Sequence, residues 1–204
     1  TGASNTAVGN GSSNATTSGS DNVSMGRDSL YFNTTGSGNT AIGRSAMQGP
    51  GSGQSTGSNN TAIGKRALFS NTTGAANVAI GNNALDANTT GDTNVAIGGT
   101  DTLSDNTTGS QNTAIGNSAL ANNTTASNNV GVGKNALLMN TTGTQNVAVG
   151  ALALDANTTA NSNTAVGYNS LGANTTGNYN VAVGGSSLTA NTTGASNVAI
   201  GRGS

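Results

Sequence analysis

The pentapeptide Asn-(Thr/Val)-Ala-(Ile/Val)-Gly, or a close variant of it, recurs along almost the whole chain, and its spacing constrains the fold more than any other feature. The step is 17 residues, except that one step is longer by four residues through Gly49-Pro50-Gly51 and one by a single residue near Gly99-Thr100. The copies begin at Asn5, Asn22, Asn39, Asn60, Asn77, Asn94, Asn112, Asn129, Asn146, Asn163, Asn180 and Asn197. A short period held over about a dozen copies is typical of a solenoid, in which each copy is stable only against its neighbours.

The composition agrees with a repeat protein better than with an ordinary globular domain or a disordered chain. Of the 204 residues only 6% are charged, whereas globular domains carry roughly 25%. Disordered chains pair low hydrophobicity with high net charge, but here the formal net charge is -1. The chain has no Cys and no His, so it lacks the usual metal ligands and the commonest acid/base residue at neutral pH. We therefore predict no cofactor, no metal site and no enzymatic activity.

Within one repeat, two β-branched positions flank a small residue. Numbered from the Asn, positions two and four carry Thr/Val and Ile/Val, and position three is mostly Ala. Successive side chains of a strand point to opposite faces, so positions two and four share one face. The pattern predicts a strand of about five residues, with position four packed inside the coil against Leu at position nine.

Like residues in successive coils should stack at the strand spacing of about 4.8 Å and form a continuous core ladder. Small residues at position three are then expected on the opposite face of the strand, as a seam between chains. The predicted core ladder consists of Ile42, Ile63, Ile80, Ile97, Ile115, Val132, Val149, Val166, Val183 and Ile200, with Leu68, Leu85, Leu103, Leu120, Leu137, Leu154, Leu171 and Leu188.

The second half of most repeats contains Asn-Thr-Thr, usually followed by Gly. Asn and Gly tolerate left-handed backbone, so the triplet is interpreted as a tight corner, and stacked amides can hydrogen-bond along the rod as a ladder. The same triplet is an acceptor for N-linked sugar, which gives these Asn a second interpretation. They are Asn33, Asn71, Asn88, Asn106, Asn123, Asn140, Asn157, Asn174 and Asn191.

The few charged and aromatic side chains give weaker signals. The seven Asp scatter over different phases of the repeat, and the chain has no acidic or basic run, so neither nucleic acid nor an anionic membrane is an expected partner. Four of the six basic residues, Arg27, Arg44, Lys65 and Arg66, fall in the first third, where solubility is the simplest interpretation. The five aromatic residues do not share one column.

The pentapeptide followed by an Ala-Leu or Ser-Leu pair resembles the head repeats of trimeric autotransporter adhesins and of related bacterial and phage surface fibre proteins. The resemblance spans Asn5 to Gly201, although the repeat of that family is usually shorter. It implies a left-handed parallel β-roll, three chains associated side by side, and display on a surface fibre that adheres to a host or matrix.

These observations predict one all-β domain over residues 1–204, a parallel β-solenoid of about twelve coils with an irregular first coil at 5–21 and an insertion around 48–56. The expected function is that of an extracellular, cell-surface or virion fibre that mediates attachment as a homo-oligomer, with a host glycan or a matrix protein as partner. One alternative is a filament subunit that polymerises end to end. Ranks of Thr raise ice binding as a further alternative, but Thr occupies position two in only five coils. No segment has the length and hydrophobicity of a membrane span.

Overall fold

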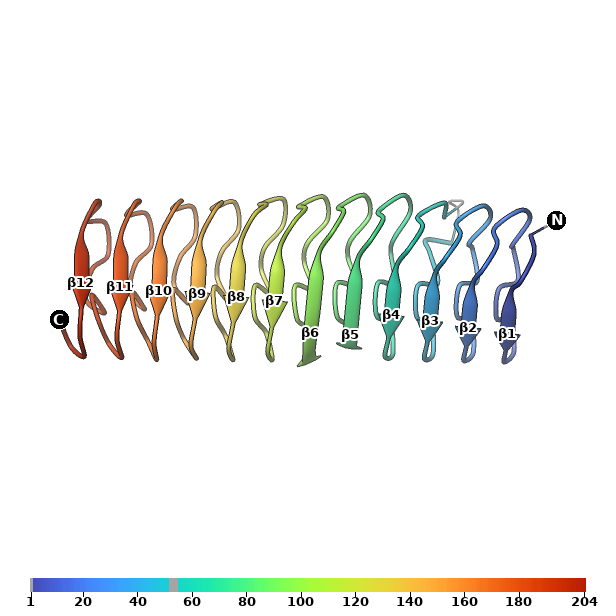
Figure 1. The fold of residues 1–204 in the computed structure, drawn as a ribbon, viewed down its shortest axis with the longest axis horizontal. Helices are drawn as coiled ribbons and strands as arrows, with labels where there is room; N and C mark the ends of the chain where they lie inside the picture. The colour runs from blue at the N-terminus through green and yellow to red at the C-terminus, as the bar shows by residue number, and fades with distance from the viewer. Residues whose placement is uncertain (1, 52–54) are drawn as a thin grey trace.

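The computed structural model describes residues 2–51 and 55–204, and these form one rod of twelve parallel strands in a single sheet (Figure 1). The strands follow one another in chain order from β1 to β12, and the described residues contain no helix. They are β1 (Thr6–Val8), β2 (Val23–Met25), β3 (Thr40–Ile42), β4 (Thr61–Ile63), β5 (Val78–Asn82), β6 (Val95–Thr100), β7 (Thr113–Ile115), β8 (Val130–Val132), β9 (Val147–Val149), β10 (Thr164–Val166), β11 (Val181–Val183) and β12 (Val198–Ile200). The predicted all-β parallel solenoid is therefore confirmed, with strands mostly of three residues instead of five.

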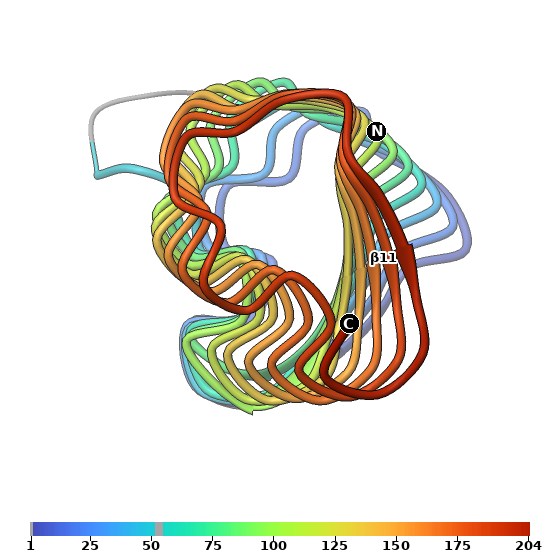
Figure 2. The ribbon, with the colours of Figure 1, turned by 90° about the vertical axis from the view of Figure 1, so that its left-hand side faces the viewer.

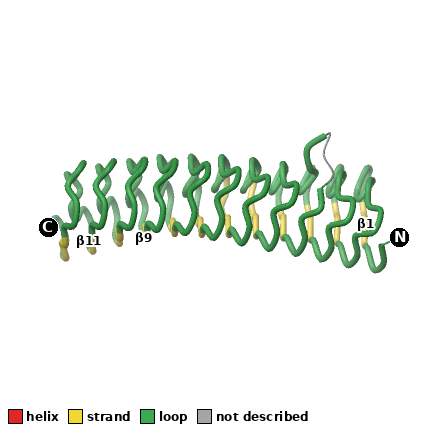
Figure 3. Tube along the Cα trace, turned by 90° about the horizontal axis from the view of Figure 1, so that it is seen from above, coloured by secondary structure: helices red, strands yellow, loops and turns green. Residues whose placement is uncertain are grey.

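Each repeat is one coil, and equivalent residues of successive coils lie over one another (Figure 2). We number each coil by its strand and each position from the Asn that precedes the strand. The sheet pairs position with position, as in Ala62 with Ala79. Coil-to-coil hydrogen bonds continue through the loops that make up the rest of each coil (Figure 3), for example from Leu68 N to Ala84 O at 2.9 Å. Backbone pairing around the whole coil thus fixes the register.

The interior of the rod contains Leu and Ala, not Leu and Ile/Val. Leu at position nine is fully buried in nearly every coil, as predicted, and Ala at positions three and eight is buried beside it. Ile and Val at position four lie on the outer face of the sheet instead, and all are half-buried or exposed. The prediction that Ile42, Ile63, Ile80, Ile97, Ile115, Val132, Val149, Val166, Val183 and Ile200 form the core ladder is therefore wrong.

The narrowness of the coil explains this reversal. Gly131 replaces Ala at position three of coil 8, and a Cβ added there would lie 3.2 Å from Ala136 O and 3.3 Å from Leu120 Cγ. The Leu column thus leaves room for only a small side chain at position three, which is Ala in most coils, Ser24 in coil 2 and Gly131 in coil 8. The larger β-branched side chains occupy the outward positions because the interior cannot hold them.

Each coil turns through residues with left-handed backbone, both at Gly, where this is common, and at Leu, where it is not. Gly at position five has a φ near 130° in most coils, for example 137° at Gly81, and a Cβ there would collide with the next coil. Leu at position nine also has positive φ, for example 54° at Leu137. Non-Gly residues rarely adopt this region, so the stacking of coils must hold Leu in it. The Asn of the Asn-Thr-Thr triplet has no positive φ, so the chain bends at the two following Thr without the left-handed backbone that was expected at this Asn.

The irregular steps of the sequence are absorbed without breaking the sheet. The extra residue near Gly99-Thr100 lengthens β6 and shifts its register against β5 beyond Ile80. The four extra residues lie in coil 3, where the path leaves the rod opposite the sheet and Ser55 rejoins it by pairing with Asn33 (Figure 2). Part of this predicted insertion, residues 52–54, lies outside the described residues.

The adjacent pair Leu137 and Leu138 tests which side chains form the core. Leu137 is fully buried at position nine, whereas Leu138 is partly exposed at position ten, where coil 7 carries Ala121. Leu137→Ala should lower the free energy of unfolding by about 2–5 kcal/mol because it leaves a cavity. Leu138→Ala should cost less than about 1 kcal/mol. Urea unfolding followed by circular dichroism measures both, and equal losses would contradict the assigned interior.

Candidate interaction surfaces

Two columns of buried Asn run through the interior, at positions one and twelve. In coil 5, Asn77 Nδ2 donates to Asn60 Oδ1 at 3.2 Å, and Asn88 Nδ2 donates to Asn71 Oδ1 at 3.0 Å. Both amides also donate to the same carbonyl at position fifteen, Gly91 O, at 2.8 and 3.0 Å. The two Asn of a coil thus form hydrogen bonds to the previous coil, and they also join two parts of their own coil through the shared carbonyl.

The Asn-Thr-Thr asparagines therefore serve as an internal ladder. All nine predicted positions are buried except Asn191, which is partly buried, and each Nδ2 donates to a carbonyl oxygen three residues later. The ladder is interrupted at coil 3, which has no Asn in the equivalent place. A sugar attached to these Nδ2 atoms would have to enter the filled interior, so this fold is compatible with the ladder and not with glycosylation there.

Removing one amide of the ladder should destabilise the rod. Asn77 accepts at Oδ1 from the backbone N and the Nδ2 of Asn94, at 2.9 and 3.1 Å. Asn77→Ala leaves the backbone N–H of Asn94 unpaired, at about 1–3 kcal/mol, and removes one of the two partners of Asn94 Nδ2 and of Gly91 O. We expect a loss of about 3 kcal/mol or more in urea unfolding. Asn117→Ala is the matched control because Asn117 is exposed and coil 9 carries Ala151 at the same position. A comparable loss of stability in this control would show that the ladder is not important.

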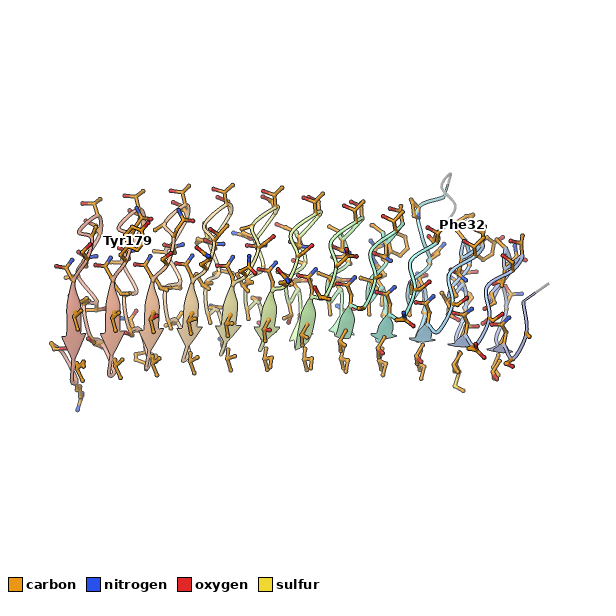
Figure 4. All side chains as sticks on the ribbon, turned by 45° about the horizontal axis from the view of Figure 1, so that its top comes forward. Phe32 and Tyr179 are labelled. Atoms are coloured by element: carbon orange, nitrogen blue, oxygen red, sulfur yellow. The ribbon has the colours of Figure 1, made fainter. Side chains whose placement is uncertain are left out.

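The outer face of the sheet is an uninterrupted uncharged surface along the whole rod (Figure 4). It consists of positions two and four of all twelve coils, which hold only Thr, Val, Ile and Met. We call it the Val/Ile face. Its side chains are partly exposed in the middle of the rod, and at its ends Val8 is 53% and Ile200 73% exposed. Monomeric proteins rarely expose contiguous apolar patches beyond a few hundred Å².

The threonines of Asn-Thr-Thr form one exposed column and one hydrogen-bonded column. The first Thr donates its hydroxyl to the equivalent carbonyl of the next coil, as Thr72 Oγ1 does to Thr89 O at 2.9 Å. The second Thr is exposed, as in Thr73 and Thr90. On the Val/Ile face, Thr is confined to position two of five coils. The described residues therefore present no pair of regular Thr ranks, which is the arrangement that an ice-binding face would need.

Basic and aromatic side chains gather in coils 2–4. Arg27 pairs with Asp28 at 3.2 Å, and Arg66 Nη2 lies 3.5 Å from Asp86 Oδ2 of coil 5. The Arg66 guanidinium also stacks 3.9 Å from the centre of the Phe69 ring. In coil 2, the Tyr31 and Phe32 rings meet edge to face with centroids 4.7 Å apart. Tyr168 and Tyr179, the other two aromatic residues, are exposed near the opposite end of the rod.

Burial raises the pKa of Asp86 above its ordinary value, although Arg66 acts in the opposite direction. Asp101 and Asp105 add smaller repulsion in the same direction as burial. Since the folded state favours the protonated acid, the stability from this group is present at low pH and is lost as pH rises through the folded pKa. Burial also raises the pKa of Asp155.

The variant Asp86→Asn removes this titration. Its melting temperature relative to the natural chain should rise as pH increases from strongly acidic to neutral, and the two proteins should converge at acid pH. Thermal unfolding across that range measures the difference. Asp21→Asn, at an exposed position in coil 1, controls for the loss of one surface charge. A relative stability of Asp86→Asn that falls with rising pH would show that the ion pair outweighs burial.

Residues 2–51 and 55–204 contain no pocket, no cluster of three potential metal ligands, and no helix that could cross a membrane. The candidate sites of this rod are therefore surfaces. Comparison of the chain with family models, with curated proteins and with solved structures gives no match.

Proposed function

We propose that this protein is a structural fibre segment that associates side by side with copies of itself and acts outside the cell, on a cell surface or on a virion, in surface attachment. The observation that carries the proposal is the Val/Ile face. It extends over all twelve coils without a charged residue, whereas charged side chains occur elsewhere around the coil. Interfaces of permanent oligomers are the protein surfaces that combine large area with such apolar character.

A second copy of the chain is the partner that best fits this face. The face is a regular array with a repeat of about 4.8 Å along the rod axis, and another rod offers the same repeat over the same length. Homo-oligomers usually close by rotation, so identical narrow faces can meet around one axis. The resemblance to adhesin head repeats favours three copies. The seam then consists of Val and Ile at positions two and four, and not of the Ala column, which is buried within each chain.

The length and regularity of the rod suit a mechanical role. About twelve coils at the strand spacing give a length of roughly 55–60 Å. Hydrogen bonds between coils and the two Asn columns stiffen this length without disulfides. Reach and surface contact are functions that such a shape can perform, and attachment to a host glycan or matrix protein is the use that we propose for it.

Charges placed on the Val/Ile face should separate the copies. The double variant Ile80→Lys with Ile97→Lys puts two cations at position four of neighbouring coils, where a copy would have to bury them at a cost of several kcal/mol. Analytical ultracentrifugation should show discrete oligomers, with three copies expected, for the natural chain and monomers for this variant. The circular dichroism spectrum should stay unchanged, since both side chains already point outward.

Thr90→Lys with Thr108→Lys is the matched control because it adds the same charges to the exposed Thr column of the same two coils. This control should sediment like the natural chain. Monomers of the natural chain at about 100 µM, well above the Kd of a stable assembly, would refute side-by-side association. Polymers that lengthen with concentration and resist the Ile substitutions would favour the end-to-end filament.

A further inference from the structure

The basic residues of this rod are concentrated in a way that the repeat does not require. Coils 2–4, residues 22–76, contain Arg27, Arg44, Lys65 and Arg66 and one acid, Asp28, so their formal charge is +3. Coils 5–12 have a formal charge of -3. One short part of the rod is therefore strongly cationic within a chain that is slightly acidic overall.

Three of these cations occupy position six of consecutive coils and form one row along the rod. Arg27, Arg44 and Lys65 are all exposed, and each directly follows the glycine at position five. Their backbones are held in register, since Arg27 O accepts from Ser45 N at 2.9 Å and Arg44 O accepts from Arg66 N at 3.0 Å. Neighbouring coils therefore place like charges beside each other at the strand spacing of about 4.8 Å, which is unfavourable for folding.

Most of this row lacks a counter-charge within the chain. Arg27 pairs with Asp28, but among the described residues no carboxylate lies within ion-pair distance of Arg44 or Lys65. The repeat allows neutral residues at position six, because Asn82, Asn117 and Ala151 occupy it in other coils. The row is thus a local feature of these coils, and its charge is available to an external anion.

Coils 2 and 4 also carry aromatic rings. Arg66 directly follows Lys65 in the sequence. Its guanidinium lies over the Phe69 ring, so the two groups form one flat surface. Tyr31 and Phe32 lie at positions ten and eleven of coil 2, and Phe69 lies at position ten of coil 4. All three rings are partly exposed. Aromatic side chains combine apolar faces with polar surroundings, which is the chemistry that receives the apolar face of a sugar ring.

We propose that the position-six row of coils 2–4 binds an acidic polysaccharide, whose carboxylate or sulfate groups pair with Arg44 and Lys65 while its chain runs along the rod. This inference rests on the attachment role proposed above, because it names the class of ligand. Four cations, of which two are already paired, are too few for a nucleic-acid surface, which commonly neutralises about 6–10 phosphates. An acidic sugar chain fits the charge and the exposed position of the row.

Binding of the full chain to immobilised polygalacturonate, dextran sulfate and neutral dextran tests the proposal. At least one acidic polymer should bind, neutral dextran should not, and added salt should weaken binding. Preference for polygalacturonate or for dextran sulfate identifies a carboxylate or a sulfate as the recognised group. The double variant Arg44→Asn with Lys65→Asn, which installs the residue of coils 5 and 7, should weaken binding about tenfold or more.

Lys134→Asn is the matched control because it removes an isolated cation from the same position in coil 8, and it should change affinity less than about twofold. Absence of binding to both acidic polymers, equal weakening by Lys134→Asn, or tighter binding to duplex DNA would overturn the proposal. Sedimentation of the Arg44 and Lys65 variant separates the two hypotheses. This variant should remain oligomeric although it no longer binds the polysaccharide. If the self-association hypothesis is wrong, the natural chain itself will sediment as a monomer, whether or not it binds the polysaccharide.

Discussion

Hydrogen bonding between successive coils in constant register is the interaction on which the rest of this structure depends. A coil of 17 residues is too small to enclose a core of its own, so its Leu and Ala are buried only when neighbours cover them. The two Asn columns make this stacking specific. Their amides satisfy one another and the carbonyl at position fifteen within an apolar interior, where any shift in register would leave several polar groups unpaired.

The same constraint explains the unusual backbone of each coil. Leu at position nine adopts a left-handed conformation in coil after coil because the neighbouring coils bind its N–H and surround its side chain. A single coil would not keep a non-Gly residue in this region. The unfavourable φ of Leu recurs in coil after coil, and in each coil the same hydrogen bond and the same packing against neighbouring coils offset its cost.

Regular stacking also determines what the surface can do. Any residue type that recurs at one position becomes a continuous stripe, so the outward Val and Ile produce a long apolar face. A local departure from the repeat becomes a patch, as with the cations of coils 2–4. The proposed self-association uses the recurring part of the sequence, whereas the proposed polysaccharide site uses the part that departs from it. A rod can therefore separate assembly from recognition along one chain.

The sequence by itself determined the coil count, the parallel strands, the buried Leu column and the places where extra residues enter, because each follows from a repeated pattern with a period of 17 residues. For the Asn of Asn-Thr-Thr it left an internal ladder and a glycosylation acceptor open, and burial in the structure favours the ladder. It did not determine which face of the strand is inside. Alternation places Ile80 and Ala79 on opposite faces but does not assign either face to the interior. The tertiary structure decided this, since Leu and the two Asn already fill the narrow coil and leave room for only a small side chain at position three. The Ala column that was expected as a seam is consequently buried within the chain, and Val and Ile form the outer face of the sheet.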